Sequence, residues 1–117
     1  MLFRSNATVR APAAVHKFDF EGELAVVIGS LAHAVSAEQA LAHVAGYTLL
    51  NDLSAREFQF DINPAQTTFA KSMDGFCPLG PHLLDAADVA DPQDLWVRSW
   101  VNDQPDRKST RLNSSHT

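Results

Sequence analysis

The stretch Phe18–Gly29, FDFEGELAVVIG, constrains the fold more than any other part of this sequence. Its first half alternates, its second half is a continuous apolar run, and a glycine closes it, which predicts a β-strand. Because side chains two apart share a strand face, Glu21 and Glu23 should lie side by side, about 7 Å apart at about 3.3 Å of rise per residue. Gly22 between them has no side chain, which lets another backbone or a ligand approach closely.

Two neighbouring carboxylates at the head of a core strand repel each other, and burial adds to the cost. A divalent cation would neutralise Glu21 and Glu23 most directly. An edge strand with a charged, solvated end would tolerate the same pair without any cation. The spacing alone leaves both alternatives open.

The composition narrows the classes of protein. The 117 residues allow at most one domain, and 45% hydrophobic residues are enough for a modest core. No stretch approaches the roughly 20 apolar residues of a membrane span and no signal peptide is recognisable, so we expect no membrane partner. The net charge of −5 argues against nucleic acid as a partner. The single cysteine, Cys77, excludes an internal disulfide and suits a reducing compartment, so we expect a cytoplasmic location.

The two ends of the chain differ from the rest. Met1–Ser5, MLFRS, and the segment 106–116, DRKSTRLNSSH, read like translations of the two strands of a short-read sequencing adapter. We therefore expect residues 1–5 and 106–117 to be added sequence that packs against nothing. Residues 6–105 are then expected to be a fragment of one domain.

The remaining elements are predicted to be short. Ser36 and Gln39 stand at the spacing of a capping box, which predicts a helix from Ser36 that ends at Gly46. Leu95–Val101 alternates and predicts a strand whose hairpin partner lies outside the sequence. Further predictions are a strand at Tyr47–Asn51, a helical turn at Ser54–Phe58, a polar loop at Asp61–Thr68, a shaped loop at Lys71–Gly80 and a short strand at Leu83–Leu84.

A third carboxylate, Asp52, stands where the strand Tyr47–Asn51 runs out. Three carboxylates without a cluster of cysteine or histidine make an oxygen-only site, which suits Mg²⁺ or Mn²⁺, with Ca²⁺ also possible. Arg56 could hold a substrate carboxylate through a bidentate pair, and Lys71 could stabilise an enolate or oxyanion. Taken singly, each of these two cations is more often an ordinary surface residue.

Four segments in order resemble the fumarylacetoacetate hydrolase family: DFEGELAVVIG, AGYTLLNDLSAREFQ, FAKSMDGFCPLGP and DPQDLWVRSWVN. Together they span nearly all of Phe18–Asn102. The resemblance implies an α+β, β-rich fold, a fragment of the family's mixed-sheet β-roll with short helices. It also implies a small 2-oxo or diketo acid as substrate, and a homodimer for the full-length protein.

The resemblance assigns roles by motif. The two glutamates of the E-x-E strand and the aspartate of the N-D pair bind the divalent metal in that family, which corresponds to Glu21, Glu23 and Asp52. The S-A-R-x-x-Q segment and the K-S loop contact substrate, which corresponds to Arg56, Gln59 and Lys71. Lys71 is also the expected catalytic residue, and family reactions include C–C bond hydrolysis, decarboxylation of oxaloacetate and isomerisation of hydroxymuconate-type dioates.

Two family features have no counterpart here: an upstream His-Glu pair on a lid that activates water, and a downstream T-G-T-P loop. We expect His16, His33, His43 and His82 to be solvent-facing or packing residues rather than substitutes. The expectation is therefore a metal-dependent hydrolase, isomerase or lyase whose central part, as written, is inactive. The alternative is a non-catalytic domain that binds a metal or metabolite.

Overall fold

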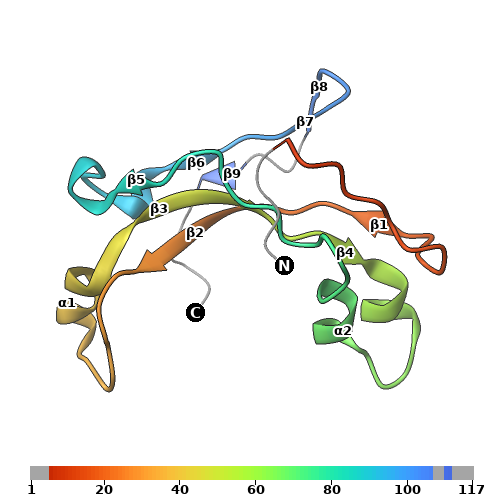
Figure 1. The fold of residues 1–117 in the computed structure, drawn as a ribbon, viewed down its shortest axis with the longest axis horizontal. Coiled ribbons are helices and arrows are strands. Elements are labelled where there is room, and N and C mark those ends of the chain that lie inside the picture. Colours follow the sequence, from red (N-terminus) through yellow and green to blue (C-terminus); the bar gives the residue numbers. More distant parts are fainter. Residues whose placement is uncertain (1–5, 107–109, 112–117) are drawn as a thin grey trace. The chain divides into compact units, whose positions relative to one another are not determined.

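A computed structural model describes residues 6–106 and the pair Thr110–Arg111 (Figure 1). The chain divides into two compact units. The first is built from residues up to Glu23 together with Leu49–Pro81, and the second from Leu24–Thr48 together with the residues from His82 on. Both combine short strands with short helices, which confirms the predicted β-rich α+β class.

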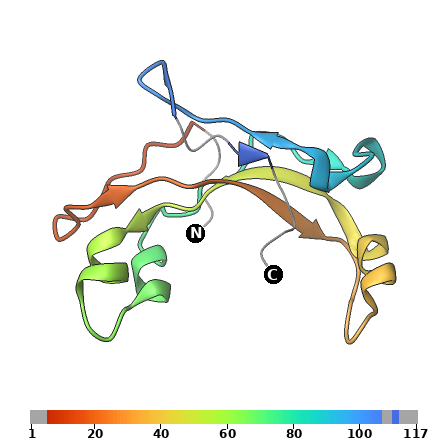
Figure 2. The ribbon, with the colours of Figure 1, turned by 180° about the vertical axis from the view of Figure 1, so that it is seen from behind.

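The first unit is organised around a pair of two-residue strands. β1 (Phe18–Asp19) runs antiparallel to β4 (Ser54–Ala55), with Phe18 opposite Ala55. A π-helical turn, η2 (Glu57–Asp61), and the helix α2 (Thr67–Lys71) follow β4 and lie side by side in both views (Figure 1 and Figure 2). The rings of Phe58 and Phe69 pack edge to face at 5.1 Å between centroids, which fixes α2 against the turn.

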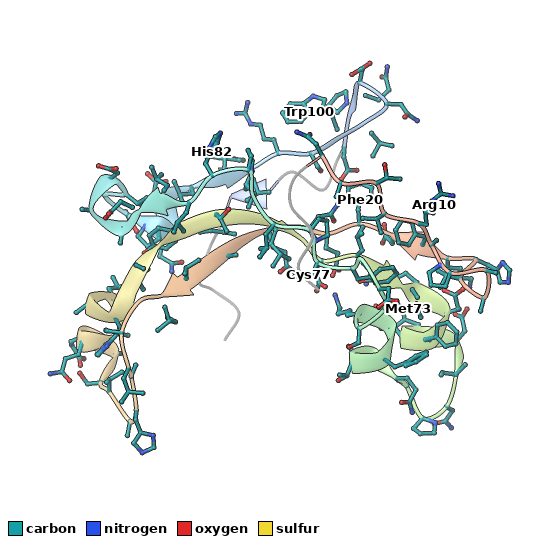
Figure 3. All side chains as sticks on the ribbon, in the orientation of Figure 1. Arg10, Phe20, Met73, Cys77, His82 and Trp100 are labelled. Atoms are coloured by element: carbon teal, nitrogen blue, oxygen red, sulfur yellow. The ribbon has the colours of Figure 1, made fainter. Side chains whose placement is uncertain are left out.

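Beneath these elements lies a small apolar core. Its buried members are Val15, Leu53, Ala55 and Phe76. Partly buried side chains that include Phe20 and Met73 pack against this core (Figure 3).

Most of a three-stranded sheet belongs to the second unit, with β3 (Val44–Asn51) between β2 (Gly22–Ile28) and β5 (Leu84–Asp85). The start of β2, up to Glu23, and the end of β3, from Leu49, belong to the first unit. β3 and β5 are antiparallel, with Gly46 opposite Asp85. The helix α1 (Ala37–Ala40) and the 3-10 turn η1 (Leu41–His43) connect β2 to β3. Further along the chain come η3 (Ala86–Asp88), η4 (Pro92–Asp94), β6 (Trp96–Val97), β7 (Trp100–Val101), β8 (Gln104–Pro105) and β9 (Thr110–Arg111). Among the described residues no helix combines the length and the apolar character that crossing a bilayer requires.

The predicted strand Phe18–Gly29 is present but interrupted. β1 ends at Asp19 and β2 begins at Gly22. In the gap, side-chain oxygens accept the backbone N–H groups: Phe20 N donates to Asp19 Oδ1 at 2.9 Å and Glu21 N donates to Asn51 Oδ1 at 3.1 Å. The sequence pattern could not reveal the interruption. Backbone N–H groups bonded to side-chain oxygens are as well satisfied as those paired with a neighbouring strand.

The predicted helix from Ser36 to Gly46 is wrong in extent. Ser36 occupies the N-cap position but makes no side-chain capping bond, and helical structure ends at His43. Gly46 lies inside β3 instead, where a Cβ would meet Leu84 O at 2.2 Å. Pairing with β5 therefore overrides the local helical pattern.

Three further predictions need correction. Ser54–Ala55 form β4, so the helical turn starts at Glu57 rather than at Ser54. The helix α2 was not predicted: it begins at Thr67, inside the predicted polar loop, and Lys71 ends it instead of opening a loop. The short strand predicted at Leu83–Leu84 is found one residue later, as β5.

The prediction for Leu95–Val101 is also wrong, because two short strands with different partners replace one. β7 pairs with β8 across Asn102 and Asp103, whose φ angles of 48° and 62° fit a two-residue type I′ turn. β6 pairs with β9. The hairpin partner therefore lies within the chain.

The expectation that residues 106–117 pack against nothing fails for the part that is described. Asp106 N donates to Ser99 O at 2.8 Å, and Thr110–Arg111 form β9. Residues 1–5, 107–109 and 112–117, Leu112 among them, lie outside the described residues, and with them the rest of that expectation.

Gly46 gives the first testable prediction. Gly46→Ala should lower the free energy of unfolding by about 1–3 kcal/mol, because the added methyl group meets the Leu84 backbone rather than a side chain that could turn away. Urea denaturation measures the change. Leu83→Ala, which shortens the neighbouring side chain, should not rescue Gly46→Ala. A Gly46→Ala variant as stable as the parent would contradict this close approach.

Candidate metal centre

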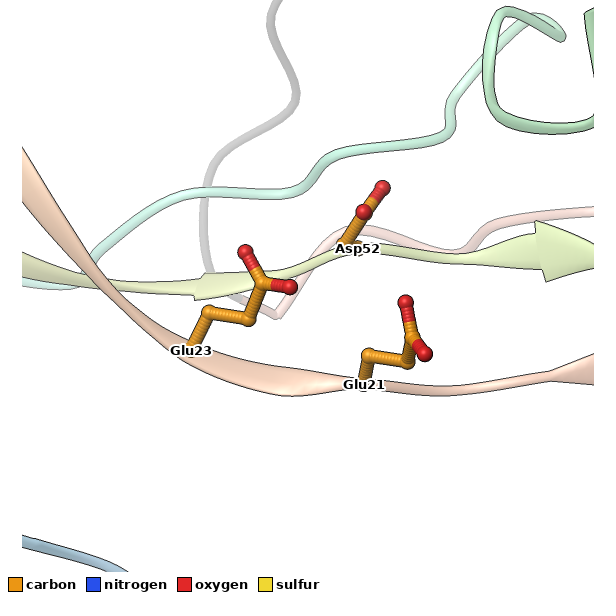
Figure 4. Close-up of side chains that lie close together, drawn as sticks. All are labelled: Glu21, Glu23 and Asp52. Carbon is orange, nitrogen blue, oxygen red and sulfur yellow. The ribbon is translucent and has the colours of Figure 1, made fainter. Parts of the chain in front are cut away.

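Three carboxylates of the first unit converge (Figure 4). Glu21, Glu23 and Asp52 each offer an oxygen, and these oxygens all lie within 4.8 Å of one another. The geometry has a local origin: Glu21 and Glu23 are two residues apart in extended chain, and Asp52 N donates to Glu21 O at 2.8 Å. We refer to Glu21, Glu23 and Asp52 as the acidic trio.

Lys71 reaches into the trio from the end of α2. Its ammonium donates to Glu21 Oε2 at 2.5 Å and also to Asp52 Oδ2. The lysine side chain is 24% exposed and its two partners are 31% and 22% exposed, so water screens these pairs only in part. Lys71, which the sequence analysis expects at the site as a substrate contact, thus lies at the trio.

Arg56 lies on the other side of Glu21 and makes three side-chain hydrogen bonds. Its Nε donates to Asp19 Oδ2 at 2.9 Å, one terminal nitrogen to Glu21 Oε1 at 2.7 Å and the other to Gln59 Oε1 at 2.6 Å. The ring of Phe60 lies 5.7 Å from the guanidinium carbon. The structure therefore brings Arg56, Gln59 and Lys71 to the trio.

The backbone holds these cations in register. Arg56 N donates to Lys17 O at 2.9 Å, which extends the β1–β4 pairing by one step and directs residue 56 toward Asp19. Ala70, next to Lys71, is fully buried, and Ser72 N closes α2 on Phe69 O. The side chains that meet here come from segments far apart in sequence.

The two glutamates of the trio have opposite electrostatics. Burial opposes the charge on Glu21, but hydrogen bonds from Lys71 and Arg56 outweigh burial and lower its pKa. Glu23 is exposed, but the desolvation that it does undergo and the charges of Asp52 and Glu21 outweigh the nearby charge of Lys71 and raise its pKa. Glu23 also makes no ion pair with any residue that the structure describes. Of the trio, Glu23 is the member whose charge is least compensated, because Lys71 acts on it only from a distance.

Two residues near the trio escaped the sequence analysis. Asp19 binds Arg56, and a signal for it existed, because Asp19, Glu21 and Glu23 alternate along one extended stretch. Cys77 is half-buried with a φ of 70°, and burial together with the charges of Asp52 and Glu23 raises the pKa of its thiol. No sequence signal pointed to Cys77.

The histidines lie as expected. His16, His33 and His82 are exposed. His43 is half-buried, and its Nδ1 is 2.9 Å from Ser30 Oγ in the second unit.

Comparison with known proteins shows the family of this chain. The profile of the fumarylacetoacetate hydrolase C-terminal domain matches residues 1–115. The chain belongs to the fumarylacetoacetate hydrolase family. It is 42% identical over 94 residues to mitochondrial oxaloacetate tautomerase fahd2 of Xenopus laevis, an alignment that covers 80% of this chain and 30% of that protein. The chain therefore spans about a third of the length of such relatives.

Solved structures of the family share the fold. A 2-hydroxyhepta-2,4-diene-1,7-dioate isomerase from Mycobacterium marinum superposes with a TM-score of 0.81 at 44% identity, over 92% of this chain and 40% of that one. A 5-carboxymethyl-2-hydroxymuconate delta-isomerase from Mycobacterium smegmatis gives a TM-score of 0.81 at 40% identity, with the same coverage. The predicted fragment of the family fold is therefore confirmed.

Family members are generally dependent on a divalent metal, and the donor set of this chain fits one. The trio offers only carboxylate oxygens, the ligands that Mg²⁺ and Mn²⁺ prefer. Asp19 and the trio carry four negative charges against the two positive charges of Arg56 and Lys71, which leaves two negative charges. A divalent cation would balance that excess.

Glu23 gives a prediction with a definite sign. A carboxyl whose pKa is raised on folding destabilises the folded state at neutral pH, and the penalty fades as pH falls through that raised pKa. Glu23→Gln should therefore stabilise the metal-free protein at pH 7, and by less at pH 5. Urea denaturation in the presence of a chelator measures both values. A loss of stability at pH 7 would contradict this electrostatic description.

Asp19 gives a second prediction. Asp19→Ala should lower the free energy of unfolding by about 1–3 kcal/mol, because a half-buried guanidinium loses a charged partner. Asp61→Ala removes an ion pair of Lys17 whose side chains are 59% and 45% exposed, so it should leave stability unchanged within error. Equal effects in denaturation experiments would show that burial of the Arg56 pair adds nothing.

Proposed function

We propose that this chain is the metal-binding core of an enzyme that acts on a small 2-oxo or diketo acid. The observation that carries the proposal is the convergence of three carboxylates with Lys71 and Arg56 at their edge. The named activities of the relatives, oxaloacetate tautomerase and dienedioate isomerase, support it. Both reactions move a proton next to a carbonyl group, so both need stabilisation of an enolate-like oxygen.

In the proposal Glu21, Glu23 and Asp52 hold the divalent cation. Mg²⁺ or Mn²⁺ suits their oxygens best, with water and substrate completing an octahedral shell, and the larger shell of Ca²⁺ would need still more ligands from outside the trio. A cation bound there would supply Lewis-acid polarisation of a substrate carbonyl. Hydrogen bonds from Lys71 and Arg56 keep Glu21 ionised, so it is ready to bind a cation near neutral pH.

The flanking residues take the rest of the substrate. Arg56 keeps one N–H on each terminal nitrogen beyond the bonds to Glu21 and Gln59, and these two would bind a substrate carboxylate. Gln59 and Asp19 fix the plane of the guanidinium. Lys71 would place its ammonium against the oxygen that gains negative charge when a neighbouring carbon loses its proton.

Among family reactions we favour tautomerisation or isomerisation over C–C hydrolysis or decarboxylation, since the three proteins compared above are named for the first kind. The full-length protein is proposed to form a homodimer. We propose that the protein is located in a reducing compartment, the cytoplasm. The Xenopus laevis relative is named as mitochondrial.

The proposal is tested by calorimetric titration of the chain with Mn²⁺ and then with oxaloacetate. Mn²⁺ should bind with one equivalent, and Glu23→Gln should weaken it at least about tenfold, because a ligand is lost. Oxaloacetate should bind only when metal is present, and Arg56→Met should weaken it. Lys17→Met serves as the control because Lys17 pairs only with Asp61 among the described residues.

Absence of Mn²⁺ binding would overturn the proposal. Metal and oxaloacetate binding without any turnover, in a protein that spans the length of the relatives, would favour the non-catalytic binding domain.

A further inference from the structure

Lys71 has an unusual pair of partners for a residue assigned to substrate. Both of the ion pairs that it makes with described residues involve trio members, Glu21 and Asp52. Arg56 differs, because two of its three side-chain acceptors, Asp19 and Gln59, lie outside the trio. Lys71 therefore occupies the trio, whereas Arg56 borders it.

An ammonium and a divalent cation would compete for the same oxygens. The trio oxygens lie within 4.8 Å of one another, and the Lys71 nitrogen already lies 2.5 Å from Glu21 Oε2. A bound Mg²⁺ or Mn²⁺ needs oxygens at about 2.1 Å and so must approach the same carboxylates. Two positive centres this close repel strongly in a half-buried site, since few water molecules screen them.

We propose that Lys71 is the internal counter-ion of the metal-free trio, and that metal uptake displaces its ammonium from Glu21 and Asp52. The inference rests on the proposed function, in which the trio binds metal. The displaced ammonium becomes available to the substrate oxygen that gains charge. Lys71 thus neutralises the carboxylates before metal binds and contacts the substrate afterwards.

The structure allows the side chain to move without the helix. The Lys71 backbone ends α2 next to the fully buried Ala70, and Ser72 N caps Phe69 O at 3.1 Å. The Lys71 side chain is 24% exposed and has a flexible four-carbon stem, so it can turn toward solvent. Rotation about side-chain bonds is enough.

If Lys71 stays in contact with the trio when metal binds, the effect of its removal on metal affinity has the opposite sign. If Lys71 orients the trio and remains in contact when metal binds, its removal should weaken metal binding. If Lys71 competes, metal affinity is reduced by the fraction of molecules in which the ammonium occupies the trio, and its removal should strengthen binding. The direction of one change therefore separates the two.

The experiment is a Mn²⁺ titration by calorimetry of the 117-residue chain, its Lys71→Met variant and the matched Lys17→Met variant. Lys71→Met should tighten Mn²⁺ binding by about tenfold or more, which corresponds to a site at least nine-tenths occupied by the ammonium. Lys17→Met should bind like the parent. Binding by the parent with equal or weaker binding by Lys71→Met overturns the exchange and leaves the metal centre intact. No binding by any of the three overturns both.

A measurement on the unmodified chain covers the case in which Lys71→Met does not fold. Acetic anhydride labels exposed, unpaired amines, and mass spectrometry locates the label. Addition of Mg²⁺ should raise the labelling rate of Lys71 at least about threefold while that of Lys17 stays constant, because only the Lys71 ion pairs are broken. An unchanged or lower rate at Lys71 under saturating Mg²⁺ overturns the exchange.

Discussion

The first unit depends on the compensation of charge around Glu21. Each of its two carboxylate oxygens accepts from a different cation, Arg56 on Oε1 and Lys71 on Oε2. These two bonds join Arg56, the N-cap residue of the π-helical turn, and Lys71, at the end of α2, to the same side chain, so the polar contacts that arrange the candidate site also connect the elements of this unit. Loss of either cation would leave one of the two carboxylate oxygens of Glu21 without its charged partner while the other pair remains, and an unpaired, partly buried oxygen destabilises the folded state.

The site carries more negative than positive charge, as the proposed binding of a divalent cation requires. Glu23 has a raised pKa and no cationic partner among the described residues, so it is unfavourable in the empty protein. Residues that serve a ligand often reduce stability in its absence. Asp19 stabilises the folded protein instead, because its negative charge is paired with Arg56 and holds the guanidinium in place.

The sequence predicted the members of the site better than the elements that carry them. The E-x-E alternation and the aspartate at a strand end are local patterns, and the structure places all six expected residues together. Their functional roles remain predictions. The extent of the helix after Ser36 was not readable locally, because a backbone contact between Gly46 and Leu84 decides it. The division of Leu95–Val101 likewise depends on partners that lie downstream.

The contacts of the site have a consequence for how it forms. Lys71 meets Glu21 across 50 positions of sequence and Arg56 meets Asp19 across 37. Contacts of such long range form late, after the cost in chain entropy of closing large loops has been met. No short peptide from this chain contains both the acidic residues, Asp19 and Glu21, and the cations that bind them, Arg56 and Lys71. Assembly of the site and completion of the tertiary structure of this unit are therefore one event, and a probe of the acidic trio also reports on the folding of the whole unit.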